Sequence, residues 1–166
     1  ISLNKDYANT LATTATFTLD LNGYDLSGLA VNGGELTVAY SKYGGNINST
    51  VAVNAGKLIL NGATLAYGVT VASGATLEQN GATINAASIA IENNGTTIIN
   101  EGVIEGTSTA GVKSAGALTL NGGLVKGNYA LWVAGGTADV KKGTLTGTAY
   151  GIYSDASTTT EKLATI

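Results

Sequence analysis

The chain has 166 residues, of which only 11% are charged and 24 are glycine, whereas proline, cysteine, methionine, histidine and arginine are absent. Without imidazole, thiol or guanidinium groups, it lacks the commonest general base, the soft metal ligands and the bidentate clamp for phosphate or carboxylate. Its net charge of −3, with 8 lysines, argues against nucleic-acid binding, and no apolar run reaches the roughly 18 residues that suggest a membrane helix.

Residues 1–15 do not fit the pattern of the rest of the chain. Ile1–Asn4 could form a strand, whereas Lys5–Thr14 is polar and irregular. We therefore expect residues 1–15 to form an N-terminal cap, followed by one repeat domain over residues 16–166.

From residue 16 onward, short alternating runs meet at joins such as Asn22-Gly23 and Asn61-Gly62. Repeats this short cannot bury their own apolar residues, so they must stack on one another, as the repeats of a solenoid do. Two glycine series share a spacing of about 20 residues: Gly23, Gly45, Gly62, Gly81, Gly102, Gly122 and Gly143, and then Gly34, Gly56, Gly74, Gly95, Gly116 and Gly136, which Ser157 continues.

The glycines and asparagines of these series indicate corners, because a sharp turn often needs a residue at positive φ. A β-hairpin at each Asn-Gly is the main alternative, since that dipeptide is a strong hairpin signal. A meander would not keep both glycine series in phase, whereas a coil that returns to the same place does. We therefore predict an all-β parallel solenoid of about seven to eight coils, each with three short strands.

The predicted core consists of small to medium aliphatic side chains that alternate with outward polar ones. Ala39–Tyr43 lengthens one coil and is expected to bulge from the shaft as a loop. The inward positions include Val51 and Val53, Val69 and Val71, Ile89 and Ile91, Leu118 and Leu120, and Leu131 and Val133.

The run Phe17–Gly28, together with later coils such as Tyr150–Tyr153, resembles the pectin-lyase-like right-handed parallel β-helix of bacterial surface adhesins. More distantly, it is similar to the passenger domains of AIDA-type autotransporters. The resemblance covers residues 16–157 and implies a right-handed parallel β-helix. Membership in a fold does not by itself imply an activity.

Enzymes of this fold would imply either a calcium-binding acidic cluster with a Lys or Arg base, or several Asp with a His and an Arg. Neither set can be assembled here, because Arg and His are missing. Asp20 and Asp25 flank one corner, but such a pair is more often solvated surface than a glycosidase dyad. We therefore predict no enzymatic activity and no required metal or cofactor, with a carbohydrate-active lyase or hydrolase as the alternative.

Aromatic residues form the best candidate ligand-binding site. Tyr129 and Trp132 recur as Tyr150 and Tyr153, each 21 residues later, which predicts two outward stacked pairs on neighbouring coils. Such side chains give rigid, amphipathic contact area for a glycan or a protein. A structural role is the alternative, in which the rings stiffen the last coils or pack against following chain. Earlier coils carry Ala30, Ala52, Thr70 and Ala90 at the corresponding position, and Tyr40 and Tyr43 of the loop form a second candidate site.

These features favour a non-enzymatic extracellular segment of a bacterial surface adhesin that acts as a stalk, a binding surface or both. The expected partner is a host or environmental glycan or surface protein, and a phage fibre module on the virion surface is an alternative. Outward Thr and Asn, such as Thr83, Asn85, Thr97 and Asn100, could also join two rods. Because the chain starts at Ile1 and Glu161–Ile166 looks like another strand, we expect the solenoid to continue beyond residue 166 in a longer parent protein.

Overall fold

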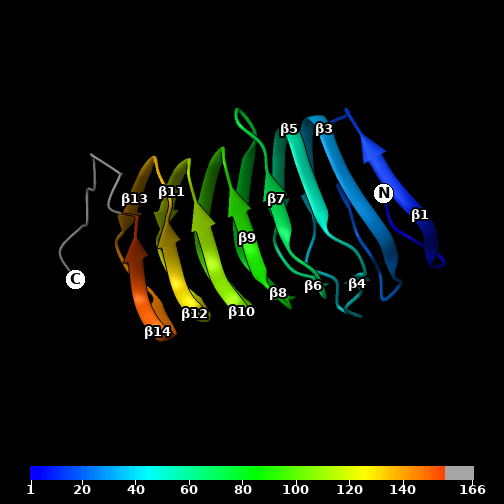
Figure 1. Cartoon of the computed structure of the whole chain (residues 1–166). Helices are drawn as coiled ribbons and strands as arrows, with labels where there is room; N and C mark the ends of the chain where they lie inside the picture. The colour runs from blue at the N-terminus through cyan, green and yellow to red at the C-terminus, as the bar shows by residue number, and fades with distance from the viewer. Residues whose placement is uncertain (156–166) are drawn as a thin grey trace.

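The computed structural model describes residues 1–155, and within them all regular structure is β. The strands lie side by side along one long axis, from the N-terminal end to the C-terminal end of a rod (Figure 1). They are β1 (Tyr7–Thr13), β2 (Phe17–Leu19), β3 (Leu26–Val38), β4 (Asn46–Ile47), β5 (Val51–Leu60), β6 (Thr64–Leu65), β7 (Val69–Val71), β8 (Thr76–Ala86), β9 (Ile89–Asn93), β10 (Thr96–Ser114), β11 (Ala117–Leu120), β12 (Leu124–Val133), β13 (Thr137–Val140) and β14 (Thr144–Ser154).

The strands stack as a parallel β-solenoid of about 7 turns. Every pairing between these strands is parallel, and most partners lie about one coil apart in the sequence. Hairpins would have paired antiparallel, so the solenoid prediction is confirmed and the hairpin alternative is wrong. The corners do not always interrupt pairing, because β10 continues for 19 residues and pairs with β8, β9, β11 and β12.

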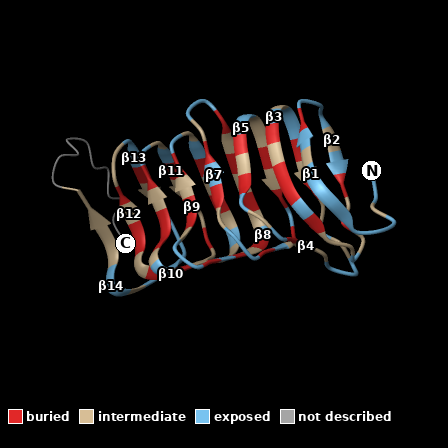
Figure 2. Cartoon of the chain, turned by 45° about the vertical axis from the view of Figure 1, so that its right-hand side comes forward, coloured by how far each residue is buried: buried red, intermediate tan, exposed pale blue. Residues whose placement is uncertain are grey.

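The core is built from columns of side chains in which each residue lies on its equivalent from the next coil. Leu58 pairs in register with Leu36 on one side and Leu77 on the other, and all three are 0% exposed. The buried positions therefore form continuous bands across neighbouring strands (Figure 2). Of the predicted inward residues, Ile89 is the exception, since it is only half-buried.

Besides Thr13 at the N-terminal end, four polar side chains occupy the core columns among the described residues. Asn93 Nδ2 donates to Ser114 Oγ at 2.9 Å and to the Ala117 carbonyl at 3.0 Å, so these two coils are joined inside the rod. The Gln79 amide likewise bonds both the N–H and the carbonyl of Ala82. The fourth, Thr97, is 0% exposed and its Oγ1 has no hydrogen-bond partner. The expectation that Thr97 faces outward is therefore wrong: it continues the inward column between Leu77 and Leu118.

Thr97→Val is expected to raise the free energy of unfolding by about 1–2 kcal/mol, because a buried hydroxyl without a partner costs about 1–3 kcal/mol. Valine has nearly the same shape and needs no hydrogen bond. Denaturant unfolding of the variant and the wild type measures the difference. A Thr97→Val protein that is less stable than wild type would show that the hydroxyl has a partner in solution.

The N-terminal segment is more regular than its sequence suggested. Ser2 forms a parallel bridge with Asp20, and β1 pairs with β3 from Tyr7 to Thr13. Residues 1–13 thus form the first coil of the stack, and the expectation of an irregular segment over Lys5–Thr14 is wrong for most of its length. Backbone pairing needs no apolar alternation, and Leu11 supplies the contact with the core. The remaining residues of β1 are largely exposed, as expected at the end of a rod (Figure 2).

The corners contain the expected residue types, although not always at the expected residue. Asn22 (φ 51°), Gly45 (φ 132°) and Gly81 (φ 151°) have positive φ as predicted. At the Asn61-Gly62 join, however, Ala63 takes φ 117° in place of Gly62. Alanine rarely adopts this backbone conformation, so strain is stored beside the Ala39–Tyr43 loop.

Asparagines line one corner of the rod as a ladder of amides. Asn80 Nδ2 donates to Asn61 Oδ1 at 2.9 Å, Asn100 Nδ2 to Asn80 Oδ1 at 2.7 Å, and Asn121 Nδ2 to Asn100 Oδ1 at 2.8 Å. From Asn80 onward, each asparagine thus donates to the asparagine of the preceding coil, and these bonds fix the register of four successive coils. The predicted continuation of the glycine series at Ser157 and the predicted strand Glu161–Ile166 lie outside the described residues.

Candidate functional site

The four predicted aromatic residues come together on the last two described coils. Tyr129 pairs in register with Tyr150, and Trp132 pairs with Tyr153. The two tyrosine rings of the first pair are stacked with centroids 6.0 Å apart, whereas Trp132 meets Tyr153 edge-on at 6.0 Å. A further stack joins Tyr129 and Tyr153 at 4.7 Å. We call these four residues the aromatic cluster.

Mutual stacking covers part of each ring. Tyr129 lies face to face with Tyr153 at an interplanar angle of 23° and meets the edge of Trp132 at 5.7 Å. Tyr150 is the most open member of the cluster, with 56% of its surface exposed. The cluster is therefore a preformed aromatic surface whose most accessible ring is Tyr150, and its internal contacts each stabilise it by about 0.5–1.5 kcal/mol beyond area burial.

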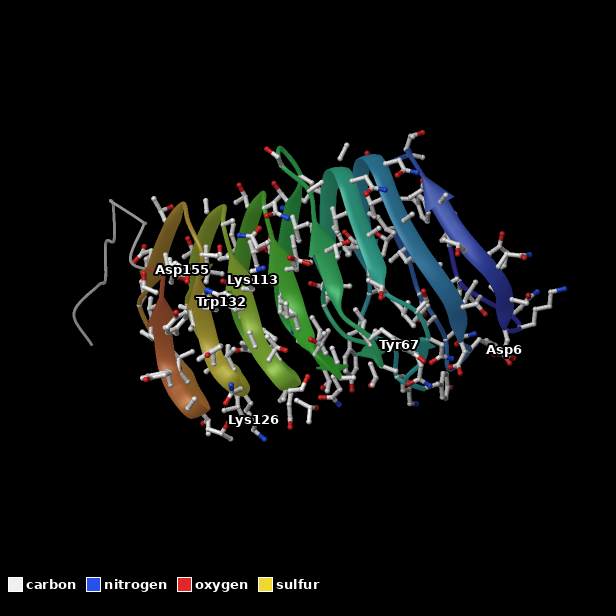
Figure 3. The ribbon with its side chains drawn as sticks, in the orientation of Figure 1. Asp6, Tyr67, Lys113, Lys126, Trp132 and Asp155 are labelled. Carbon is white, nitrogen blue, oxygen red and sulfur yellow. The ribbon has the colours of Figure 1, made fainter. Side chains whose placement is uncertain are left out.

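Three charged side chains border the cluster. Lys113 Nζ lies 4.8 Å from the centroid of the Trp132 ring and 3.6 Å from Glu92 Oε1. On the other side, Trp132 Nε1 donates to Asp155 Oδ2 at 3.2 Å. The labelled side chains of Lys113, Trp132 and Asp155 lie close together on one face of the rod (Figure 3). This combination of a cation over the indole face and an acceptor at its N–H fixes the orientation of the Trp132 ring.

The outward column that leads to the cluster corrects one expectation. Thr70 pairs with Glu92, and Glu92 pairs with Lys113, whereas Ala90 is 0% exposed. The expectation that Ala90 faces outward is therefore wrong, because this coil is longer than the mean and brings Glu92 to the position above Thr70. Within the described residues, the full column consists of Ala12, Ala30, Ala52, Thr70, Glu92, Lys113, Trp132 and Tyr153. Its residues change from small to charged to aromatic toward the C-terminal end.

Sequence reasoning missed Glu92, Lys113 and Asp155 as neighbours of the cluster. For Lys113 a signal was present, since it lies 19 residues before Trp132 and so one coil away. Polar side chains at the neighbouring corner also escaped notice: Ser88 and Thr109 share a hydrogen bond of 3.0 Å, and Thr148 Oγ1 lies 3.0 Å from Asn128 Oδ1. Of these four residues, Asn128 directly precedes Tyr129, and Thr148 lies two residues before Tyr150.

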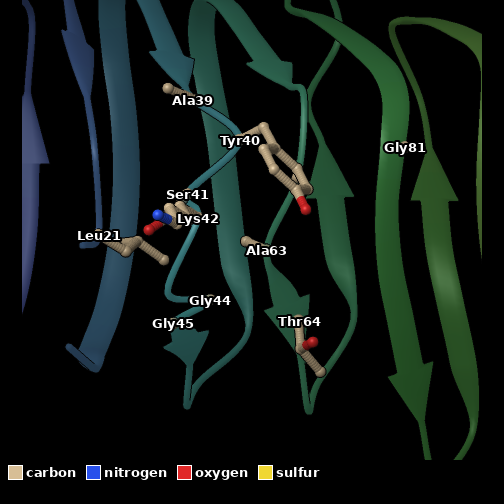
Figure 4. A pocket seen from close by; sticks show the side chains of 11 residues that line it. Leu21, Ala39, Tyr40, Ser41, Lys42, Gly44, Gly45, Ala63, Thr64 and Gly81 are labelled. Atoms are coloured by element: carbon tan, nitrogen blue, oxygen red, sulfur yellow. The ribbon is translucent and has the colours of Figure 1, made fainter. Parts of the chain in front are cut away.

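The second candidate site lies on a separate part of the rod. Residues 39–45 form a loop between β3 and β4, as predicted, and Tyr40 and Tyr43 are 77% and 70% exposed. Figure 4 shows Tyr40 reaching across the neighbouring corner, where a hollow of about 240 Å³ is lined by the loop and by Gly62, Ala63, Thr64 and Gly81. Lys42 Nζ lies 5.7 Å from the Tyr43 ring centroid. The loop and the aromatic cluster are therefore two separate candidate sites.

Both members of the acidic pair considered for catalysis accept hydrogen bonds, within one corner for Asp20 and between neighbouring coils for Asp25. Asp20 Oδ1 accepts the Asn22 N–H at 2.8 Å, and Asp25 accepts hydrogen bonds from Asn46 and Asn48. Burial raises the pKa of Asp25, but hydrogen bonds from the side chains of Asn46 and Asn48 and from the Asn46 backbone outweigh this and lower it below its ordinary value. Both carboxylates thus act as acceptors for neighbouring polar groups.

Among the described residues, Glu78 forms the ion pair with the shortest distance, with its Oε2 2.7 Å from Lys57 Nζ. The hydrogen bond from Lys57, a second one from Asn80 and the Lys57 charge lower the pKa of Glu78 below its ordinary value of 4.5, against a smaller opposing effect of burial. Since the folded pKa lies below the unfolded pKa, this contribution to stability is present above about pH 4.5 and is lost as the pH falls through the folded value.

Glu78→Gln is therefore expected to weaken the loss of stability on acidification, because glutamine has no proton to gain in this range. Urea unfolding at intervals from about pH 7 to about pH 3 would measure the slope for both proteins. Lys57→Met should flatten the acid limb in the same way. Parallel pH profiles for wild type and Glu78→Gln would contradict the assignment.

Residues 1–155 contain no group of three or more His, Cys, Asp or Glu side chains arranged to hold a metal ion. The same part of the chain has no helix with the length and apolar character needed to cross a membrane.

No protein-family model, no curated protein sequence and no solved structure matches the chain significantly. What can be proposed about function therefore depends on the residues of this chain.

Proposed function

We propose that this chain is a non-enzymatic, extracellular β-solenoid segment of a bacterial surface adhesin. In this proposal the coil stack is a stiff stalk, and the aromatic cluster is the surface that binds a glycan or protein of the host or environment. The observation that carries the proposal is the cluster itself: four aromatic side chains gather on one face, with Tyr150 more than half exposed.

The chemistry of the cluster supports binding. Trp and Tyr are the residues most often found at the energetic centre of interfaces, where a polar rim excludes water around them. Here the rings are held by one another, and Trp132 is also held by Lys113 and Asp155. A ligand would therefore meet side chains that are already ordered, which lowers the entropic cost of association.

The composition supports the stalk and its location. A chain with few charges and no cysteine suits a rod that needs neither disulfides nor a metal to be stable outside the cell. Columns such as Leu36–Leu58–Leu77 tie each coil to its neighbours, so the binding face keeps a fixed direction relative to the rod axis. The adhesin resemblance noted in the sequence agrees with this role.

Binding to a glycan array and to a panel of extracellular matrix proteins would test the proposal, using wild type, Trp132→Ala and Tyr67→Ala. Tyr67 is a matched control, because it is 52% exposed but lies away from the cluster (Figure 3). We expect Trp132→Ala to weaken binding by at least about thirtyfold, the size of an interface hot spot, and Tyr67→Ala to leave it unchanged. Equal binding by wild type and Trp132→Ala, or no binding by either, would reject the cluster as the site.

Lateral self-association is a separate part of the proposal, and its surface is smaller than the sequence suggested. Thr97 is buried, and the Asn100 amide already bonds Asn80 and Asn121 within the chain. Thr83 and Asn85, on the outward side of β8, are the residues left to join two rods. Sedimentation at increasing concentration tests this, and a strictly monomeric rod at the highest concentration would exclude it.

A further inference from the structure

The chain contains six Asn-Gly steps, and asparagine followed by glycine is prone to spontaneous deamidation. The steps begin at Asn22, Asn32, Asn61, Asn80, Asn94 and Asn121. The backbone nitrogen of the glycine can attack the asparagine side-chain carbonyl, because glycine has no Cβ to hinder the approach. The reaction releases the side-chain amide as ammonia. It is slowed when a hydrogen bond holds either the departing Nδ2 or the attacking N–H.

The amide ladder and one backbone acceptor hold the departing group at three of the six steps. Asn80 Nδ2 donates to Asn61 Oδ1 at 2.9 Å and to Glu78 Oε1 at 3.2 Å. Asn121 Nδ2 donates to Asn100 Oδ1 at 2.8 Å, and Asn22 Nδ2 donates to the Leu3 carbonyl at 3.0 Å. At these steps the amide nitrogen is fixed in place as a donor.

At two steps the attacking N–H is held. The Gly23 N–H donates to the Gly44 carbonyl at 3.0 Å, which gives the Asn22 step a second restraint. The Gly95 N–H donates to Asn93 Oδ1 at 3.2 Å. The Asn32-Gly33 step lies inside β3, where Asn32 pairs with Ala55 of β5 and the backbone is restrained on that side. The pairing of β3 with β1 ends one residue earlier, at Val31.

The Asn61-Gly62 step has neither restraint. Asn61 is exposed and its Oδ1 accepts from Asn80, but its Nδ2 has no acceptor among residues 1–155, because the preceding coil carries the Ala39–Tyr43 loop where the ladder would continue. Gly62 lies between the end of β5 and the start of β6, and no acceptor for its N–H is found in the same range. The next residue is the strained Ala63, with φ 117°.

We propose that Asn61 is the preferred site of spontaneous deamidation in the folded protein. The Gly62 nitrogen bonds to Asn61 Cγ, the Cγ–Nδ2 bond breaks, and Nδ2 leaves as ammonia with the proton from the Gly62 N–H. Water then opens the cyclic imide at one of its two carbonyls, which gives aspartate or isoaspartate. The net change is the exchange of an amide nitrogen for a water oxygen, with no redox step.

The two products differ in their effect on the second candidate site. Aspartate keeps an oxygen that can accept from Asn80, so the ladder is retained. Isoaspartate lengthens the main chain directly under Tyr40, where an atom at the Cβ position of Gly62 would already lie 3.0 Å from Tyr40 Cδ2 (Figure 4). The isoaspartate form therefore displaces the Ala39–Tyr43 loop and leaves the aromatic cluster unchanged.

The test is incubation of the full folded chain in mildly alkaline buffer, followed by peptide mapping with mass spectrometry. Asn61 is expected to deamidate several-fold faster than Asn80 and Asn121. In denaturant the three steps should react at similar rates, because their local sequence is alike. A folded protein in which Asn80 or Asn121 reacts as fast as Asn61 would overturn the proposal.

A second variant tests the protective role of the ladder directly. Asn100→Ala removes the acceptor of Asn121 Nδ2, and one hydrogen bond of ordinary strength corresponds to about a three- to tenfold change in rate. We expect deamidation of Asn121 to accelerate by that factor in the variant. Asn85→Ala, which removes an exposed amide outside the ladder, is the control and should leave the deamidation rate of Asn121 unchanged. An unchanged Asn121 rate in folded Asn100→Ala would also overturn the proposal.

Discussion

Leu58→Ala is expected to lower the free energy of unfolding by about 3 kcal/mol, within the range of about 2–5 kcal/mol for replacing a buried leucine by alanine. Leu58 is 0% exposed and lies between Leu36 and Leu77 in a central coil. Neither neighbour can move into the space, because each is itself fixed by strand pairing on both sides. The loss therefore includes a cavity term as well as the lost transfer energy.

Ile59→Ala is the matched control for this prediction. Ile59 is the next residue in β5, but it points outward and is half-buried. Its truncation should cost less than half as much. Denaturant unfolding of both variants gives the comparison, and equal losses would mean that the inward and outward assignments of β5 are wrong.

Gly116→Ala is expected to lower the free energy of unfolding by about 2–3 kcal/mol, as overpacking against a rigid neighbour does. A methyl group at Gly116 would collide with the backbone of Gly95 and Asn94 in the preceding coil. Backbone atoms cannot rotate away as a side chain can. The two coils must therefore separate locally, which weakens the hydrogen bonds between them.

Gly74→Ala separates this steric effect from a conformational one. Gly74 has φ 80°, but nothing lies within 4 Å of its added methyl group. Gly74→Ala should lower the free energy of unfolding by only about 1–2 kcal/mol, which is the cost of placing an alanine in the left-handed backbone conformation. Thermal unfolding of both variants would show the order, and a Gly116→Ala protein more stable than Gly74→Ala would contradict the close approach of the coils.

Much of the fold could be predicted from the sequence, because every coil of a solenoid repeats the same spacing of glycines and the same alternation of apolar residues. The spacing of the glycine series and the alternation of Val51, Val53, Val69 and Val71 predicted the parallel stack and the core. The error at Ala90 arose where a coil departs from the mean length. Thr70 pairs with Glu92 and not with Ala90, since that coil is longer, and one such shift changes which side chain faces out.

Part of the candidate site could also be predicted. The 21-residue recurrence of Tyr129 and Trp132 as Tyr150 and Tyr153 correctly placed the cluster on neighbouring coils. The stack between Tyr129 and Tyr153 could not be predicted, because it depends on side-chain rotamers across a diagonal. The amide ladder could not be predicted either. Its hydrogen bonds form only when the asparagine side chains of four successive corners lie directly above one another.

The most direct test of the binding proposal uses the intrinsic fluorescence of Trp132, which is the single tryptophan of the chain. Ligands from the glycan and protein screens would be titrated into wild type, Tyr150→Ala and Tyr40→Ala. The proposal predicts a saturable change in Trp132 emission for wild type and Tyr40→Ala, and a weaker or absent change for Tyr150→Ala. A ligand that binds all three proteins equally while Trp132 emission stays constant would contradict it.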